Sequence, residues 1–241
     1  MGFWSSIKKA VKAVVKTVKA VVKAVVEYVI IKPLKFLTSW IPVSKKMRIQ
    51  VFILRTEAGV PLLDNEPALQ QLQSAVNYAT DVFKRRFNIK LQQYGKPIIQ
   101  TLPKPAPVAA LDVNCDGGAF KNEVGEAGTY FEKNLAGWNI IPISLTFPIS
   151  VFIVRDIAGK VGCSLGALTD YVTLSVDGTR TIMVSEVSVS STLAHELGHC
   201  CGLQHRSDTK NLMYQSRNSR GDNITYWQKY VVRSSRHCTF F

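Results

Sequence analysis

The chain has 241 residues, 46% of them hydrophobic, and a formal net charge of +13 that by itself would suggest a nucleic-acid partner. Residues 1–50 hold eleven lysines and arginines against one acid, whereas residues 51–205 hold twelve against fourteen. The basicity therefore belongs mainly to an N-terminal segment, and no specific nucleic-acid partner is expected. About 195 residues beyond that segment are enough for one hydrophobic core.

Residues 8–26 are a near-repeat of lysines and valine pairs. The lysines recur at steps of four and three residues while valines fill the other side, which is the period of an amphipathic helix. The lysines on this pattern are Lys8, Lys12, Lys16, Lys19 and Lys23. With Phe3 and Trp4 before it and Trp40 after it, the segment resembles a cationic membrane-binding peptide. We expect residues 5–31 to bind an anionic membrane surface or a partner protein.

Lysine interrupts every apolar run well before the roughly 18 residues that a membrane-spanning helix needs. We therefore expect neither a cleavable signal peptide nor a transmembrane helix. The localisation stays open between a secreted protein and one held at a membrane or particle surface. Pro33 and Pro42 prevent a helix from running into the first strand. This predicts two parts: a basic amphipathic helical segment over residues 1–45 and one folded domain over residues 46–241.

The folded domain begins with a β-rich apolar run at residues 47–54 and continues with helical spacing over residues 66–87. Further strands are expected at residues 88–92, 150–155, 171–176 and 181–185. Asp177-Gly178 is typical of a hairpin turn between the last two strands. A helix around residues 120–135 completes a mixed α/β pattern.

Three of the four histidines fall within eleven residues, at His195, His199 and His205. On a helix that begins at residues 190–191, His195 and His199 are four apart and share one face, so both imidazoles can bind one metal ion. Glu196 is rotated from His195 by about 100°. Its carboxylate then lies beside the metal, where it can hold a water molecule.

A third ligand requires the chain to turn after the helix. Gly202 accepts the positive φ that ends a helix, so the backbone can bring His205 to the same ion. Three neutral imidazoles leave one coordination position open, and a water there would have its pKa lowered to roughly 7. Cys200 and Cys201 are rotated away from the histidine face, which argues against a closed structural zinc site.

At this point the chain resembles the metzincin clan of zinc metallopeptidases, whose extended histidine pattern is followed by a methionine turn. The matching positions are His195, Glu196, His199, Gly202, His205 and Met213. In that clan the methionine lies beneath the metal, which implies this role for Met213. Arg206 and Gln215 depart from the residues that the better-known families carry, so the resemblance reaches the clan and not one family.

The resemblance implies an α+β, zincin-like fold: a mixed twisted sheet of about five strands, a long backing helix and an active-site helix. It implies one catalytic Zn²⁺ and hydrolysis of internal peptide bonds in a protein or peptide substrate, with Glu196 as the general base for a metal-bound water. An edge strand above the cleft would pair with the substrate. By chain order we expect that strand at Tyr171, Val172, Thr173 and Leu174. We expect residues 159–166 to be a loop, either one near the cleft or a plain connection.

Five cysteines leave at least one unpaired, and the sequence does not decide their pairing. We expect His237 at the surface. A second class of function stays open, in which the chain is a membrane-active or assembly protein, such as a toxin or particle component, with an ancillary zinc site. Zinc content and cleavage of an unfolded protein separate the two classes.

Overall fold

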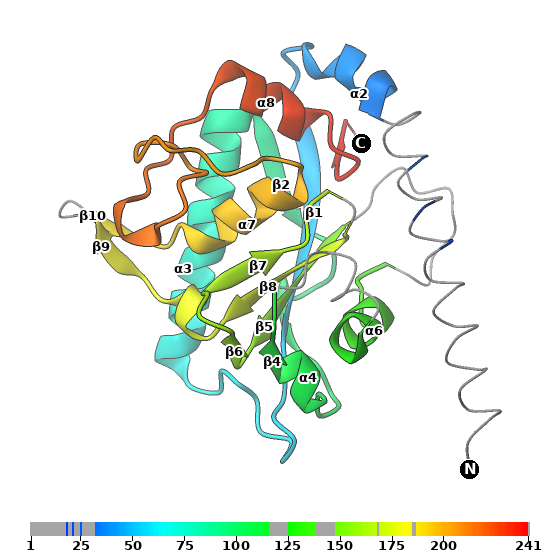
Figure 1. Ribbon diagram of the computed structural model, residues 1–241, viewed down its shortest axis with the longest axis vertical. Coiled ribbons are helices and arrows are strands. Elements are labelled where there is room, and N and C mark those ends of the chain that lie inside the picture. Colours follow the sequence, from blue (N-terminus) through cyan, green and yellow to red (C-terminus); the bar gives the residue numbers. More distant parts are fainter. Residues whose placement is uncertain are drawn as a thin grey trace.

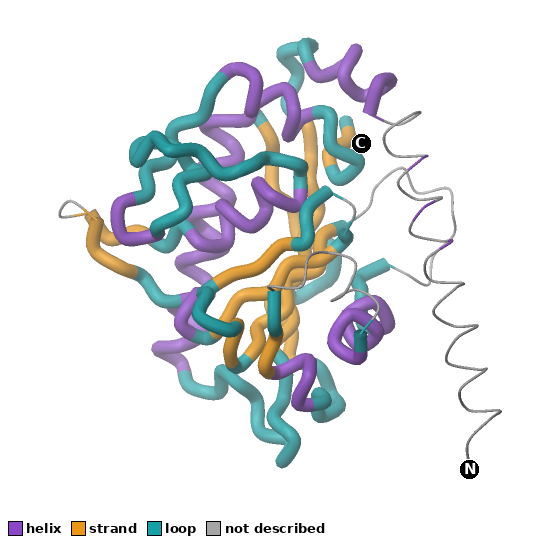
Figure 2. The backbone as a smooth tube through the Cα atoms, in the orientation of Figure 1, coloured by secondary structure: helices purple, strands orange, loops and turns teal. Residues whose placement is uncertain are grey.

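The computed structural model describes residues 18, 21, 25, 32–115, 125–137, 148–167, 169–184 and 187–240. These residues form a mixed sheet with helices on both faces, which confirms the predicted α/β class (Figure 1). Helices α3 (Glu66–Val82) and α7 (Thr192–Cys200) cover one face, and α4 (Val108–Leu111) and α6 (Glu126–Lys133) cover the other (Figures 1 and 2).

The main sheet has the strand order β11-β1-β5-β8-β7, and β2 and β3 also pair with β1. Its strands are β1 (Lys45–Ile53), β2 (Ile89–Gln93), β3 (Ile99–Thr101), β5 (Ile149–Val154), β7 (Gly162–Ser164), β8 (Tyr171–Ser175) and β11 (Cys238–Thr239). Strands β2, β3 and β5 run parallel to β1, and β8 runs parallel to β5. Strand β7 is antiparallel to β8, and β11 is antiparallel to β1. Strand β7 therefore forms one edge of the described sheet.

Every residue of β5 is buried, because helices cover both faces of this central parallel strand. Ile149, Val151 and Ile153 join the core beneath α3 and α7. Phe152 and Val154 point to the opposite face and join a second core cluster with Phe52, Phe131 and Tyr171. The continuous apolar sequence of β5 is thus the signature of a strand with two buried faces.

Helix α3 begins where the side chain of Asn65 accepts a hydrogen bond from the backbone N–H of Ala68 at 3.0 Å. Its buried face is made by Leu72, Ala75, Val76, Ala79 and Val82. We predicted one helix to residue 87, and the chain continues to that point as a π-helical turn, Phe83–Phe87. Asn88, with φ of 57°, then turns the chain into β2.

The predicted hairpin at Asp177-Gly178 is wrong. The Oγ of Ser175 accepts the backbone N–H of Gly178, and residues Asp177–Thr179 close into a 3-10 turn. The chain then leaves the main sheet, and β9 (Ile182–Val184) pairs with β10 (Val187–Val189) instead of β8. On the other face, a short parallel pair links β4 (Asp112–Val113) to β6 (Asp156–Ile157).

The first described helix, α2 (Lys32–Ser39), packs on α8 (Tyr226–Arg233) through aromatic contacts. Trp40, just beyond α2, stacks on Tyr230 with ring centroids 4.0 Å apart. Buried Arg233 donates hydrogen bonds to the backbone carbonyls of Ser39, Ile41, Val43, Phe87 and Asn88. This guanidinium fixes the connection between α2 and β1 to the rest of the domain.

The amphipathic helix expected over residues 5–31 lies outside the described residues, apart from positions 18, 21 and 25. The helix expected around residues 120–135 is described from residue 125 onward, as α6. None of the helices in the described ranges combines the length and apolar character needed to cross a membrane.

Candidate metal centre and cleft

Helix α7 carries His195 and His199 on consecutive turns, with Glu196 next to His195. The Nε2 atoms of His195 and His199 lie 3.0 Å apart, so the two imidazoles converge on one point. The helix begins after Ser191, whose side chain makes no capping hydrogen bond to the first turn. The position of the helix start was therefore predicted correctly, but the serine cap was not.

The chain turns sharply after α7 at Gly202, which has φ of +96°. This conformation is open to glycine and strained for other residues. The backbone N–H of Leu203 donates to Gly198 O at 3.0 Å, which closes the helix end. As a result His205 comes back to the helix, and its Nε2 lies 3.0 Å from that of His199.

The other ring nitrogens set the protonation of two of these imidazoles. Nδ1 of His195 is 2.9 Å from Leu212 O, and Nδ1 of His199 is 2.8 Å from Leu203 O. A carbonyl only accepts, so each Nδ1 carries the proton and each Nε2 presents a bare lone pair. Burial lowers the pKa of His195 to about 2 and that of His199 to about 4, and it also lowers the pKa of His205.

Three neutral nitrogen donors within 4.8 Å of one another fit a zinc ion. Tetrahedral zinc with bonds of about 2.0–2.1 Å separates two ligand nitrogens by roughly 3.3 Å, close to the spacing found here. The donor set consists of imidazoles alone, without a thiolate, which is typical of catalytic rather than closed structural zinc sites.

The carboxylate of Glu196 lies beside this donor set, directly beneath β7. The side chain is almost fully buried, and burial raises its pKa to about 7 despite opposing effects of Arg220, Lys160 and the backbone of Ser164. A Cβ atom on Gly162 would lie only 2.7 Å from Glu196 Oε1. The edge strand therefore passes so close to the carboxylate that a side chain at position 162 would displace either Glu196 or the strand.

Met213 lies under the histidine helix, fully buried. A Cβ on Gly198 would lie 2.7 Å from Met213 Sδ, so the lack of a side chain at position 198 lets the methionine pack against the helix. The backbone N–H of Met213 donates to Asn211 Oδ1, and the Asn211 amide exchanges two hydrogen bonds with Gln228 on α8. Gly198 and Gln228 could not be identified from the sequence, because neither is a metal-ligand type or a charged residue.

Arg220 is a further residue that the sequence did not single out. It is 4% exposed, and its guanidinium donates to Tyr214 O at 2.7 Å and to Gln215 O at 2.9 Å. Its Nη1 is 3.5 Å from Ser191 Oγ at the start of α7. Arg220 thus ties the segment after Met213 to the histidine helix and places a positive charge near Glu196.

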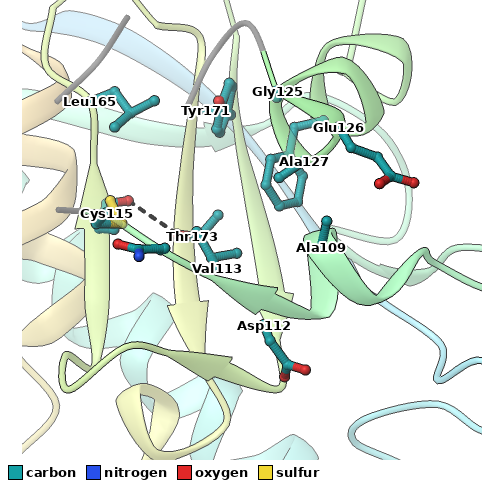
Figure 3. A pocket seen from close by; sticks show the side chains of 14 residues that line it. Ala109, Asp112, Val113, Cys115, Gly125, Glu126, Ala127, Leu165, Tyr171 and Thr173 are labelled. Atoms are coloured by element: carbon teal, nitrogen blue, oxygen red, sulfur yellow. Dashed lines mark hydrogen bonds between the residues drawn. A yellow bond between two sulfur atoms is a disulfide. The ribbon is translucent and has the colours of Figure 1, made fainter. Parts of the chain in front are cut away.

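The histidines and Glu196 open into a cleft of about 880 Å³ whose other wall is formed by residues 159–167. A smaller cavity of about 220 Å³ lies on the opposite side of β7 (Figure 3). Its walls include Phe131, Tyr171 and Thr173. The disulfide Cys115–Cys163 separates the two cavities and joins β7 to the chain that follows β4.

Three predictions need correction. Residues Tyr171–Leu174 do not form the sheet edge, because β8 has β5 on one side and β7 on the other. Residues 159–166, expected as a loop, line the cleft, but their residues Gly162–Ser164 form the edge strand β7. His237 is buried, not at the surface, because β11 pairs with β1 and carries it inside, where its Nε2 is 3.6 Å from Cys200 Sγ.

A comparison with known protein families covers the same part of the chain. The family model Peptidase_M10: Matrixin matches residues 124–227, a span that contains the whole histidine motif and Met213. A search of curated proteins found no match.

The chain is also similar to two solved structures. One is metalloproteinase-II from Bacteroides fragilis, with 12% identity and a TM-score of 0.45, covering 77% of this chain and 52% of that chain. The other is archaemetzincin from Methanopyrus kandleri, with 12% identity and a TM-score of 0.42, covering 78% of this chain and 93% of that chain. The chain thus spans about half the length of the Bacteroides protein.

Proposed function

We propose that this chain is a zinc endopeptidase of the metzincin type, which hydrolyses internal peptide bonds of protein substrates with Glu196 as general base. The observation that carries the proposal is the buried Glu196 carboxylate, placed between three converging imidazoles and an open edge strand. A bound Zn²⁺ would polarise the scissile carbonyl and lower the pKa of the attacking water.

The protein side chains then have separate tasks. His195, His199 and His205 hold the ion, and their burial keeps them neutral and able to bind it. Glu196 takes a proton from the attacking water and passes it to the departing amine. Strand β7 pairs through its outer edge with an extended substrate backbone. It takes the role that the sequence predicted for Tyr171–Leu174.

Cleavage of casein by the wild-type protein and by Glu196→Gln tests this proposal. The substitution keeps the shape that fits beneath Gly162 but removes the base, so the rate should fall by at least about 100-fold. Zinc content should stay the same in both proteins. A folded, zinc-loaded Glu196→Gln protein that cleaves at the wild-type rate would refute the mechanism. Zinc binding without any cleavage by the wild type would favour the alternative of an assembly protein with an ancillary metal site.

We further propose that residues 1–45 dock the enzyme on an anionic membrane surface. Residues 1–50 carry eleven basic side chains against one acid. The described part of this segment, on α2 and the connection to β1, forms an exposed apolar patch together with the start of α8. It consists of Leu37, Trp40, Ile41, Val43, Tyr226 and Trp227. Tryptophan and tyrosine favour the membrane interface, where basic residues meet anionic headgroups.

Vesicle sedimentation tests docking independently of catalysis. Full-length protein should bind vesicles with one third phosphatidylserine and bind neutral phosphatidylcholine vesicles much more weakly. Removal of residues 1–31 should abolish most of the binding. Equal binding before and after the removal would contradict the proposal, and no vesicle binding by the full chain would favour a protein partner.

A further inference from the structure

The cleft around Glu196 carries an excess of positive charge. Lys160, Arg217 and Arg220 line it, and Glu196 is the one carboxylate among the described residues that do so. A substrate that enters therefore meets three cations in addition to the metal. Charged groups in a cleft with protein walls act more strongly than on an open surface, because less water screens them.

Arg220 can be compared with Arg233, the other buried arginine whose hydrogen bonds go to backbone carbonyls. Arg233 makes five such bonds, which occupy all the donors of a guanidinium. Arg220 makes three hydrogen bonds in the described structure, and it borders the cleft. Two of its five N–H donors therefore remain to recognise a ligand.

The three cations gather at one end of the cleft. Lys160 precedes β7, and the next residue, Val161, accepts a hydrogen bond from Ser175 N at the end of β8. Arg217 donates to Asp177 O at 2.8 Å, in the turn that follows the same strand end. Arg220 lies near Ser191, and the neighbouring Ser190 donates its hydroxyl to Thr179 O in the same turn. All three thus lie toward the start of β7.

The position of the three cations in the cleft determines which part of the substrate they contact. A peptide added antiparallel to β7 runs from the side of Ser164 toward the side of Lys160. Glu196 lies beneath Gly162 and near the backbone of Ser164, so the scissile bond sits above that pair. Substrate residues beyond the scissile bond, toward the C-terminus, then approach the cations.

We propose that the cleft selects substrates with an aspartate or glutamate side chain shortly after the scissile bond, bound by Arg217 and Arg220. The inference rests on the proposed peptidase activity and on antiparallel pairing with β7. A guanidinium binds a carboxylate through paired, charge-assisted hydrogen bonds, whereas a glutamine amide of the same shape offers a weaker acceptor.

Matched quenched fluorescent peptides test the selection, with glutamate, glutamine or lysine at each of the first three positions after the cleaved bond. For the full-length, zinc-loaded enzyme we expect kcat/KM to be about tenfold higher for glutamate than for glutamine at one of these positions, and lowest for lysine. Equal values for glutamate and glutamine at all three positions would overturn the inference. So would a preference confined to positions before the cleaved bond.

The source of the preference is tested by comparing ratios within each protein. Arg217→Gln should lower the glutamate-to-glutamine ratio toward one. Lys104→Gln, which removes an exposed lysine outside the cleft, should keep the wild-type ratio. Because Arg220 also holds the segment after Met213 through backbone carbonyls, its charge is kept in the variant Arg220→Lys. This variant should give a glutamate-to-glutamine ratio between that of the wild type and one.

Binding to the Glu196→Gln protein separates this inference from the proposed function. Calorimetry should give a Kd about tenfold lower for the glutamate peptide than for its glutamine partner. Tighter binding of glutamate without cleavage by the wild type would remove the peptidase proposal and leave the acidic selection. Cleavage with equal Kd and kcat/KM values for both peptides would support the peptidase proposal and remove the acidic selection.

Discussion

At the scale of single residues, the site depends on two kinds of position. The metal-binding histidines and Glu196 could be predicted from the sequence, because their roles follow from spacing on one helix and one turn. Gly162, Arg220 and Gln228 could not. Each acts through a contact with a segment distant in sequence. No local spacing pattern of glycine, arginine or glutamine predicts such a contact.

Gly162 gives the sharpest prediction at this scale. A methyl group there would collide with Glu196 Oε1, so Gly162→Ala must displace either the carboxylate or the edge strand. We expect kcat/KM for casein-derived peptides to fall by at least about tenfold, since a small displacement of a general base is costly. Zinc content and the melting temperature should change little, because Gly162 is only half-buried at the sheet edge. Unchanged kinetics would show that the strand does not constrain the base.

At the scale of elements, the sequence predicted the buried strands well and the functional strand badly. Strand β5 stands out as a continuous apolar run because both of its faces are covered. Strand β7 has three residues, Gly-Cys-Ser, and none of them favours a strand. Pairing with β8 and the disulfide through Cys163 hold it in place instead, and neither is visible in a local pattern.

The disulfide should therefore matter for both stability and substrate binding. It closes a chain separation of 48 residues, for which loop-closure entropy gives roughly 3–4 kcal/mol of stability. Urea unfolding should show a loss of this order for Cys115→Ser and for Cys163→Ser. Both should also raise KM for peptides, because β7 loses an anchor. The double variant should be no less stable than either single one, since all three lack the same bond; additive losses would contradict this.

An ion-pair cluster predicts a pH-dependent contribution to stability. Asp222 contacts Arg86 at 2.6 Å and Arg85 at 2.9 Å, and so joins the π-helical turn to the segment before α8. Partial burial raises the pKa of Asp222, but the hydrogen bonds from the two arginines outweigh it, and the net pKa lies below the ordinary value. The stabilisation is then fully present above the ordinary aspartate pKa of about 3.9 and is lost as the pH falls through the lower folded-state pKa.

Asp222→Asn should therefore reduce the free energy of unfolding by about 1 kcal/mol at pH 7. The difference from the wild type should shrink below pH ~4, where the carboxylate becomes protonated in the unfolded and then the folded state. Asp156→Asn, at an exposed aspartate without an ion pair in the described structure, serves as the matched control and should change stability little. A difference that persists undiminished at low pH would exclude the electrostatic explanation.

At the scale of the whole molecule, composition predicted a basic segment and one core, but not where the segment joins the core. We placed the division at residue 45. The described contacts show α2 packed on α8, and the carbonyls of Ser39, Ile41 and Val43 bound by Arg233. A sequence cannot reveal such a connection, because carbonyl acceptors are the same at every residue.

Two truncations should separate the basic repeat from this connection. Removal of residues 1–31 should leave the free energy of unfolding nearly unchanged. Removal of residues 1–44 takes away three of the five acceptors of buried Arg233, and we expect a loss of at least ~3 kcal/mol, since hydrogen bonds to charged groups contribute more than neutral ones. Chemical denaturation of both proteins measures this. Equal stability of the two truncated proteins would mean that the arginine finds other acceptors or water.

The guanidinium of Arg233 also determines how the molecule would respond to a pulling force. A tether attached ahead of residue 32 transmits its load first to α2 and to the carbonyls at positions 39, 41 and 43. Those bonds share the load before β1 is reached, so the central strand is shielded from unravelling. If residues 1–31 hold the enzyme at a moving surface, the sheet and α7 would stay folded under load for as long as the hydrogen bonds of Arg233 to these carbonyls hold.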